Sequence, residues 1–377
     1  MEKMRLGDIA QLINGDRGKN YPSQSDIAQK GEIPFVNAGH LNGKGIDFKE
    51  MNYISEEKYN KLNSGKFQKD DILYCLRGSL GKKAIVSSNI NGAIASSLVI
   101  IRPDPAKVSG EYLMFALDSP AIREQLVKAN NGSSQPNLSA TSVREYRVEL
   151  PELSLQEEVV EKLEKVISII DGRKQEVQLL DDLIRARFVE MFGDAVDNPM
   201  GWEKKQLQEI VTDDCTISYG IVQTGNDQEE GVPVFRPVDI VNRIPKLEEL
   251  KRTTEEISNK YKRTILKGHE MLITVRANIA DTCIVGKEFK GCNVGRGIVP
   301  IRTQENIMVL EFLKYLMDSK HLNDDIKSKA KGITLIQLNM EDLREVELIV
   351  PPIEQQKAFV EFAEQVNKSK LYKISTL

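Results

Sequence analysis

The 377-residue sequence is long enough for two or three domains, and its 40% hydrophobic and 29% charged content is ordinary for a globular protein. No apolar run reaches the roughly 20 residues that cross a membrane, and the N-terminus lacks the apolar stretch of a signal peptide. We therefore expect a cytoplasmic protein without membrane contact, whose four scattered cysteines are free thiols. The net charge of −4 argues mildly against DNA binding, but many acidic residues fall within one predicted helix.

The first part of the chain, residues 1–153, predicts a mixed α/β domain with a curved sheet. A polar loop at 14–25 precedes short runs that are rich in Val, Ile, Phe and Tyr. Each run is flanked by Gly, Asn or Pro, a pattern typical of β-strands. A helix at 110–129, a short helix-like stretch and a strand ending at Pro151 follow. The predicted strands are Ile33–Asn37, Asp71–Leu76, Ala84–Ser87 and Leu98–Arg102.

Residues 154–193 predict one long helix of about 58 Å, because they contain no proline. One heptad series is fully apolar and its companion is interrupted by two arginines, a spacing typical of a coiled coil. We predict Ser154 as the N-cap, with Glu157 completing a capping box, and place any kink at Gly172. The side chains expected to pack or to meet a partner are Val159, Leu163, Val166, Ile170, Val177, Leu180 and Ile184.

The second half of the chain repeats the first half. Residues 131–166 align with 331–366 without a gap at a shift of 200, so that Arg144 matches Arg344. Weaker matches at nearly the same shift extend back to the N-terminus. Because a solenoid repeat has only about 20–50 residues, these are duplicated domains, and the second covers residues 194–353. Its predicted elements are strands at Val232–Arg236, Met271–Arg276, Thr282–Val285 and Ile298–Arg302 and a helix at 308–329.

Residues 354–377 predict a second, shorter helix. It begins as the first long helix does and then becomes polar. We expect the two helices to lie antiparallel and to pack together, with Phe359, Phe362 and Val366 at the contact.

The chain resembles the specificity subunits of type I restriction–modification systems over essentially its whole length. The blocks that carry the resemblance occur twice, and Met191–Asp194, Asn198–Pro199 and Gly201–Glu203 open the second unit. A junction of proline, glutamine and helix also occurs twice, at Pro151 and Pro351. The resemblance implies two tandem pseudo-repeated target recognition domains, separated by long coiled-coil-like helices in a pseudo-twofold arrangement.

The resemblance also implies a function. Each domain would read one half of a bipartite double-stranded DNA target, while the helices set the gap and hold two modification subunits that carry S-adenosylmethionine. A translocating restriction subunit would join in a restriction complex, and no cofactor is expected on this chain. The second helix is shorter than the family pattern. A naturally shorter form, a truncated chain and a chain completed by another copy all stay open.

Gln156 and Gln356 recur at the start of the two helices. One interpretation is a contact that caps the helix. The other is a junction that holds the globular domain to the helix, and we favour the junction.

No catalytic constellation is visible in the sequence. Asp197–Met200 resembles a methyltransferase motif only in passing, because it lacks the second proline and the aromatic residue. Gly39–Gly45 does not have the spacing of a P-loop. His269, Cys283 and Cys292 lack the paired spacing of metal ligands. We therefore expect a protein that is not an enzyme and holds no metal.

Loop residues with hydrogen-bonding side chains are the candidates for DNA contact, because such side chains read base edges or bind phosphates. In the first unit they are Arg17, Lys19, Asn20, Tyr21, Asn37, Arg77, Ser79, Lys82, Ser134 and Gln135. In the second they are Ser218, Tyr219, Gln223, Thr224, Arg236, Arg276, Asn278, Arg296 and Thr334. Arg236 takes the place of Asn37, which predicts two different half-sites. For each residue, a solvated loop or a salt bridge is the alternative.

Two other functions stay open at this point. A protein-interaction scaffold, whose repeats bind polypeptide, would show no salt-sensitive binding to DNA. A specificity subunit of a system that only methylates cannot be distinguished from the restriction case by this sequence, because the difference lies in the neighbouring subunits.

Overall fold

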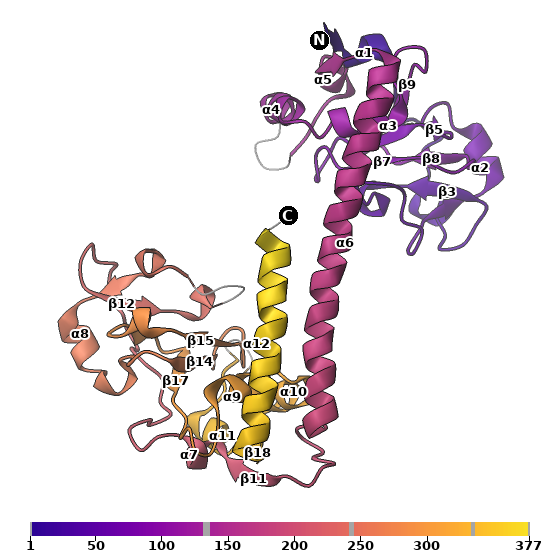
Figure 1. The fold of residues 1–377 in the computed structure, drawn as a ribbon. Helices are drawn as coiled ribbons and strands as arrows, with labels where there is room; N and C mark the ends of the chain where they lie inside the picture. Colours follow the sequence, from indigo (N-terminus) through magenta and orange to yellow (C-terminus); the bar gives the residue numbers. More distant parts are fainter. Residues whose placement is uncertain (1, 131–135, 241–244, 333–335, 376–377) are drawn as a thin grey trace. The chain divides into compact units, whose positions relative to one another are not determined.

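The computed structural model describes residues 2–130, 136–240, 245–332 and 336–375. The chain forms two compact units, residues 1–170 and 171–377, and the long helix α6 (Leu153–Phe192) contributes to both (Figure 1). Within the described ranges, no helix is both long enough and apolar enough to cross a membrane.

Unit 1 is built on two four-stranded sheets. The order β2-β9-β6-β7 makes an antiparallel sheet, and β4-β3-β8-β5 makes a second one in which β3 and β8 run parallel. All four strands predicted from the sequence are confirmed, with ends that differ by one or two residues. The strands are β2 (Ala10–Asn14), β3 (Ile33–Val36), β4 (Tyr53–Ile54), β5 (Lys66–Phe67), β6 (Ile72–Cys75), β7 (Lys83–Ile85), β8 (Gly92–Ile94) and β9 (Leu98–Pro103).

The helix predicted at 110–129 is wrong as a single element. It consists of α3 (Gly110–Ala116) and α4 (Pro120–Ala129). Pro120 lacks the N–H that would continue α3, but its fixed φ suits the first position of a new helix, which Ser119 caps. The helix predicted at 308–329 divides in the same way, into α9 (Leu310–Met317) and α10 (Lys320–Ser328). The remaining helices of unit 1 are α1 (Leu6–Ile9), η1 (Gln24–Asp26), η2 (Ala38–His40), α2 (Glu56–Lys61) and α5 (Ala140–Arg144).

Unit 2 repeats this plan, with fewer strands among its described residues. Its sheets have the orders β15-β14-β17 and β13-β12-β16. At the position of β2, Val211 forms an isolated bridge with Thr303. The four predicted strands are confirmed. The elements are α7 (Leu207–Ile210), β12 (Val232–Phe235), η3 (Pro237–Asp239), η4 (Leu247–Glu249), β13 (Arg252–Thr253), α8 (Glu255–Asn259), η5 (Lys262–Thr264), β14 (Glu270–Thr274), β15 (Thr282–Val285), η6 (Lys287–Phe289), β16 (Asn293–Val294), β17 (Ile298–Ile301) and α11 (Met340–Arg344).

A two-stranded ribbon closes each unit just before its long helix. In unit 1, β1 (Glu2–Arg5) pairs with β10 (Arg147–Leu150). In unit 2, β11 (Glu203–Gln206) pairs with β18 (Glu347–Val350). Each ribbon joins the beginning of a unit to its end, so that the following helix starts from a fixed point.

Helix α6 is continuous for 40 residues, about 60 Å, and runs through Gly172 without interruption. The predicted N-cap is wrong, because the helix begins at Leu153 and Ser154 lies inside the first turn. The backbone carbonyl of Glu152 accepts the first helical bonds instead. In unit 1, Val159 packs against the core beside β2, β6 and β9.

In unit 2, the last turns of α6 pack against α9 and α12 (Ile353–Ser375) through an aromatic cluster. The Phe188 ring lies 5.4 Å from that of Phe359. Farther along α12, Lys370 Nζ lies 2.5 Å from Asp181 Oδ1. Later residues of α12 therefore lie beside earlier residues of α6, so the two helices run in opposite directions. The predicted antiparallel packing is confirmed within this unit (Figure 1). The rings of the cluster belong to Phe188, Phe192, Phe312 and Phe359.

The two repeated glutamines make the same three hydrogen bonds at the same positions. Gln156 accepts from the Ser109 N–H at 2.9 Å and donates to the carbonyls of Lys107 and Pro151, each at 2.9 Å. Gln356 makes the equivalent bonds, each with a partner numbered 200 higher, which are Ile307, Val309 and Pro351. Both glutamines are fully buried. The junction interpretation is confirmed, because each side chain joins the first turn of a long helix to the loop before α3 or α9.

Replacing Gln356 by leucine should lower the free energy of unfolding of unit 2 by about 3 kcal/mol. The substitution leaves one buried N–H and two buried carbonyls without this partner, and each such group costs about 1–3 kcal/mol. Trp202 is the single tryptophan of the chain, and its indole N–H bonds to the Phe192 carbonyl, so its fluorescence in a urea titration reports on unit 2. Gln355→Leu, at the exposed neighbouring position, is the matched control. Equal midpoints for the two variants would contradict the expected role.

Candidate nucleic-acid interface

The sheet topology brings the predicted DNA-contact loops of unit 1 to one edge. Strands β2 and β6 run antiparallel to β9, so their last residues lie beside the first residue of β9. Strands β3 and β8 are parallel and end together at the same place. We call this edge the loop edge. It consists of residues 14–21, 37–40, 76–82, 95–98 and 137–138 in unit 1, and 217–221, 236–239, 275–280, 295–298 and 337–338 in unit 2.

A tight turn between β8 and β9 lies at the centre of the loop edge of unit 1. It is closed by the bond from Leu98 N–H to the Ala95 carbonyl, 3.0 Å long. On one side the Ala95 N–H bonds to the Val36 carbonyl, and on the other the Leu76 N–H bonds to the Ser97 carbonyl, both at 2.8 Å. Leu138 in turn donates to Leu76, again at 2.8 Å, which adds the segment before α5. We call residues 95–98, and 295–298 in unit 2, the central turn.

Unit 2 builds the same backbone arrangement. Ile298 closes the central turn on the Gly295 carbonyl at 3.1 Å, and Gly295 donates to Phe235 at 2.8 Å. The Val275 N–H bonds to the Gly297 carbonyl at 2.9 Å, and Leu338 donates to Val275 at 2.9 Å. Every one of these bonds has its counterpart in unit 1 at a shift of 199 or 200. The two units thus share one backbone support for different side chains.

The candidate residues of unit 1 fall into two groups at this edge. The first group can reach a ligand. It consists of the exposed Arg17, Lys19, Arg77 and Ser79 and the half-buried Asn20. The other three side chains serve the fold. Asn37 accepts from the Gly39 N–H at 2.8 Å, Lys82 donates to the Ala38 carbonyl at 2.9 Å, and the Tyr21 ring lies against Phe35. This second group stabilises the support on which the first group stands.

The candidates of unit 2 divide similarly. Tyr219, Gln223, Asn278 and Arg296 are exposed, and of these Gln223 lies beyond the loop edge. Arg236 forms two bonds with the Asp239 carboxylate, at 2.9 and 2.6 Å, so that this arginine and Asn37 both serve local turns. Arg276 donates to Gln337 Oε1 at 2.5 Å. Ser218 meets the Thr216 hydroxyl, and the Thr224 carbonyl accepts from the Thr253 hydroxyl.

Three candidates, Ser134, Gln135 and Thr334, lie outside the described residues. The residues that follow them are held at the loop edge, since Arg77 forms a β-bridge with Asn137 and Arg276 forms one with Gln337. Sequence reasoning missed Asn137 and Gln337, and it also missed Ser96 and Ser97. The repeat offered a signal for Ser96 and Ser97, because they align with Arg296 and Gly297 at a shift of 200.

The residues predicted to pack along the helices differ in how deeply they are buried. Ile184, Phe359 and Val366 are buried in the core of unit 2, and Leu180 and Phe362 pack against it. Ile170 and Val177 are half-buried. Leu163 and Val166 are 38% and 50% exposed, which leaves them available to another protein. The heptad pattern did not identify Phe188 and Phe192, which carry most of the aromatic contact in unit 2.

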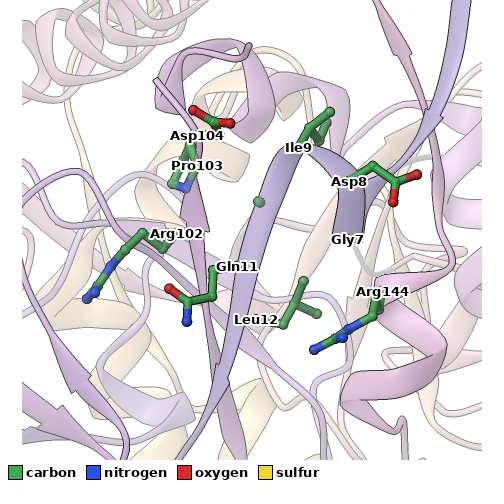
Figure 2. Close-up of a pocket in the computed structure, with 10 residues that line it drawn as sticks. Gly7, Asp8, Ile9, Gln11, Leu12, Arg102, Pro103, Asp104 and Arg144 are labelled. Atoms are coloured by element: carbon green, nitrogen blue, oxygen red, sulfur yellow. The ribbon is translucent and has the colours of Figure 1, made fainter. Parts of the chain in front are cut away.

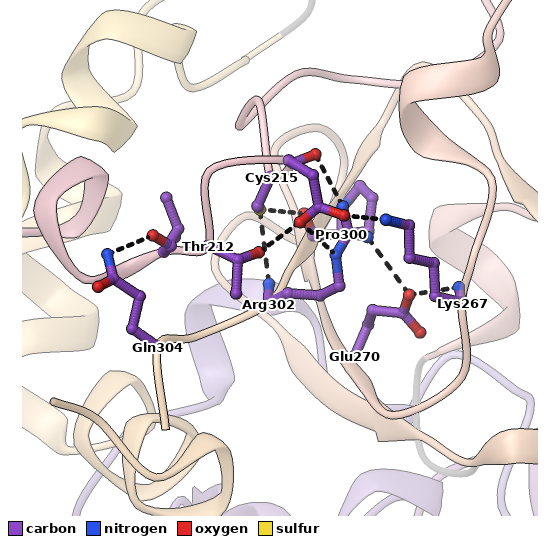
Figure 3. A network of polar contacts seen from close by, with 9 residues as sticks. Thr212, Cys215, Lys267, Glu270, Pro300, Arg302 and Gln304 are labelled. Atoms are coloured by element: carbon purple, nitrogen blue, oxygen red, sulfur yellow. Dashed lines mark hydrogen bonds and ion pairs between the residues drawn. The ribbon is translucent and has the colours of Figure 1, made fainter. Parts of the chain in front are cut away.

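Each unit also holds a buried ion pair at the end of its main sheet opposite the central turn. In unit 1, Arg102 makes two bonds with the Asp71 carboxylate, at 2.7 and 2.8 Å. In unit 2, Arg302 lies 3.3 Å from Glu270 and joins Asp214 and Lys267 in a network (Figure 3). These arginines are held within the fold and are not free to bind DNA.

A pocket of about 450 Å³ opens at the same end of the sheet in unit 1 (Figure 2). Gly7–Leu12, Arg102–Asp104 and Arg144 line it. In β9, Leu98 is at the central turn and Pro103 is at the pocket, about 16 Å away at strand spacing. The pocket is therefore not part of the loop edge.

One group among the described residues carries side chains of the kinds that bind metal ions. Asp194, Asp197 and His321 place their ligand atoms within 4.8 Å of one another. Asp194 is already engaged, since it accepts the N–H groups of Val196 and Asp197 and contacts His321 at 2.5 Å. All four cysteines are free and buried. Burial raises the pKa of Cys283 to about 12, which keeps this thiol protonated and unreactive near neutral pH.

Two positions in the loop that follows Arg77 or Arg276 have a left-handed backbone. In unit 1 they are glycines, Gly78 and Gly81, with φ of 78° and 76°. In unit 2 they are alanines, Ala277 and Ala280, with φ of 61° and 64°. Alanine in this region costs about 1–2 kcal/mol because its Cβ crowds the following carbonyl. The loop of unit 2 is therefore held under strain that glycine relieves in unit 1.

Comparison with known proteins gives a consistent result. A family model described as a type I restriction modification DNA specificity domain matches residues 1–179 and 199–374. The EcoBI specificity subunit of a type I restriction enzyme from Escherichia coli is 24% identical over 264 residues, which is 64% of this chain and 56% of that relative. This chain thus spans little more than half the length of that relative. The StySPI specificity subunit from Salmonella potsdam is 19% identical over 382 residues, covering 93% of this chain and 79% of the relative.

Solved structures show the same fold. A chain from a structure of the complex assembly and conformational transition of the type I R-M system superposes with a TM-score of 0.62 at 20% identity, covering 100% of this chain and 93% of the other. The S subunit of a type I restriction–modification system from M. genitalium gives a TM-score of 0.54 at 12% identity, covering 100% and 91%. The predicted fold class, with two tandem mixed α/β domains and a long helix, is confirmed.

Replacing Ala277 by glycine should raise the free energy of unfolding of unit 2 by about 1 kcal/mol, because it removes the left-handed strain. The control is Ala186→Gly, at an exposed position of helix α6 in the same unit, where the same chemical change should lower the value by about 1 kcal/mol. Urea titrations monitored by Trp202 fluorescence measure both. A shift in the same direction for the two variants would mean that the loop is not strained.

Proposed function

Because this chain belongs to the family of type I restriction modification DNA specificity domains, we propose that it is the sequence-specific DNA-binding subunit of a type I restriction–modification complex. The observation that best supports DNA binding is the loop edge that each unit presents. Each unit presents exposed hydrogen-bonding side chains on the same backbone support, with Arg77 in one unit and Asn278 in the other. Side chains of these types read bases and contact phosphates.

The target has two different halves, and each unit reads one of them. The shared backbone bonds give both units the same way of approaching DNA. The side chains on that support differ, since Ser79 matches Asn278 and the half-buried Ser96 matches the exposed Arg296. A duplicated chain can thus do what a symmetric dimer does with paired half-sites, but with unequal halves. Helix α6 sets the length of the unread gap between them.

The chemistry belongs to the partner subunits. We propose that two modification subunits, which bind S-adenosylmethionine, transfer the methyl group, while this chain recognises the target sequence. A restriction subunit joins them when the system cleaves DNA. The described residues fit this division, because the Asp194 carboxylate is engaged with backbone N–H groups and His321 and the four thiols are buried.

Helix α6 offers surface for such partners. Several of its large apolar side chains are exposed, although many of the other exposed residues of the helix are charged. Exposed apolar side chains at helical spacing fit the apolar face of a partner helix. Those in unit 1 are Leu155, Leu163, Val166 and Ile169, and those in unit 2 are Leu179, Leu183 and Val189.

Co-expression with the neighbouring modification subunit, in a host without methylases of its own, should produce methylation at one split motif with a constant gap. Long-read sequencing of the host DNA maps the modified bases and gives both half-sites. Omitting this chain should abolish the methylation. Binding of the complex to a duplex with that motif should weaken steeply with salt, because phosphate contacts release counterions.

A stable complex that methylates no DNA would contradict the proposal. Retention on a polypeptide but not on DNA would favour the scaffold alternative. Methylation without cleavage, even with all neighbouring subunits present, would assign the chain to a system that only methylates.

Deleting residues 170–176 from α6 should shorten the gap of the motif and leave both half-sites unchanged. Seven residues are about 10 Å of helix, which corresponds to about 3 base pairs of B-DNA. Their removal preserves the heptad register of the residues that follow. The matched control replaces the same seven residues by alanine at unchanged length, and its gap should equal that of the wild type. An unchanged gap in the deletion variant would refute the ruler role of α6.

A further inference from the structure

Arg296 stands on a closely supported turn of the loop edge in unit 2. It is one of the two middle residues of the central turn, which Ile298 closes on Gly295. Neighbouring segments bond to this turn from both sides, through the Phe235 carbonyl and the Val275 N–H. A Cβ at Gly297 would lie 2.5 Å from Pro237 Cγ, so glycine lets the turn sit tightly against η3. The backbone beneath Arg296 is thus fixed before any ligand arrives.

The Arg296 side chain, in contrast, is free to bind. Among the residues that the structure describes, its guanidinium makes no hydrogen bond or ion pair, and it lies over the Tyr219 ring with 5.9 Å from Cζ to the ring centroid. The neighbouring arginines of the loop edge are engaged, Arg236 with Asp239 and Arg276 with Gln337. The face of an aromatic ring attracts a guanidinium and leaves the N–H donors at its rim available.

We propose that Arg296 is a specificity-determining residue, which reads a guanine in the half-site of unit 2. This inference rests on the proposed function. A guanidinium matches the O6 and N7 acceptors of guanine in the major groove with two parallel hydrogen bonds, and that match distinguishes guanine from the other bases. The fixed turn and the Tyr219 ring limit the orientations of the side chain, which base reading requires more than phosphate binding does.

Unit 1 arranges the same residue types differently. Its central turn carries Ser96 and Ser97, both half-buried. The Ser96 N–H donates to the Tyr21 hydroxyl, and the Arg17 guanidinium donates to the Ser96 carbonyl, each at 3.4 Å. The arginine of unit 1 therefore comes from the loop after β2, whereas that of unit 2 comes from the turn itself. Base recognition by the central turn is thus assigned to unit 2 alone.

The test compares Arg296→Ala with wild type in the co-expressed complex, by mapping methylated sites with long-read sequencing. The variant should accept any base at one position where wild type requires guanine, with discrimination reduced at least tenfold. The other half-site and the gap should stay the same. Arg263→Ala, at an exposed arginine of η5 that is not among the residues of the loop edge, removes the same charge and should leave the motif intact. Because Arg296 is exposed, both variants should unfold at the wild-type urea concentration.

The other results have separate meanings. Uniformly weaker methylation at an unaltered motif would show that Arg296 binds a phosphate, and it would overturn base reading. An Arg296→Ala motif and rate equal to those of wild type would overturn the inference while leaving the proposed function intact. If wild type itself yields no split motif, the proposed function fails, and the inference fails with it. Loss of specificity at positions in both half-sites would also count against it.

Discussion

The hydrogen bonds of Gln156 and Gln356 are the constraint on which the rest of the structure depends. Each glutamine is buried, and each uses its single carbonyl and both amide hydrogens to tie a helix start to the loop before α3 or α9. A buried amide with all of these bonds made has one orientation, because any rotation leaves a polar group unpaired at considerable cost. The direction in which each long helix leaves its unit is fixed by these contacts and by the ribbon that precedes the helix.

The loop edge follows from a second constraint, the antiparallel course of the strands. Successive strands of an antiparallel sheet turn back at alternating ends, so loops far apart in sequence meet at one edge. In unit 1 this brings Arg17, Arg77 and Ser96 together although 79 residues separate the first from the last. The surface that contacts a ligand is thus built from short segments, and the sheet behind them holds each in place.

Much of this organisation could be predicted from the sequence, for reasons that particular residues make clear. The strands were visible because runs such as Ile298–Arg302 are mostly apolar and follow a glycine. The junction was visible because Gln156 and Gln356 repeat at a constant shift. The division at Ser119 was missed because apolar periodicity continues across it, while the pairing of β1 with β10 depends on contacts almost 150 residues apart. The roles of Asn37 and Arg236 as turn caps were equally invisible, since the same side chains could as well have faced a base.

The partners of the two glutamines have a consequence for how this protein can vary. Every bond that Gln156 makes ends on a main-chain atom, at Lys107, Ser109 and Pro151. The corresponding residues around Gln356 include Ile307 and Val309, whose side chains have nothing in common with lysine and serine. The junction therefore depends on the path of the backbone and not on the side chains of the residues that it contacts. The side chains at these positions can therefore change while the main-chain contacts that fix the start of each helix are kept.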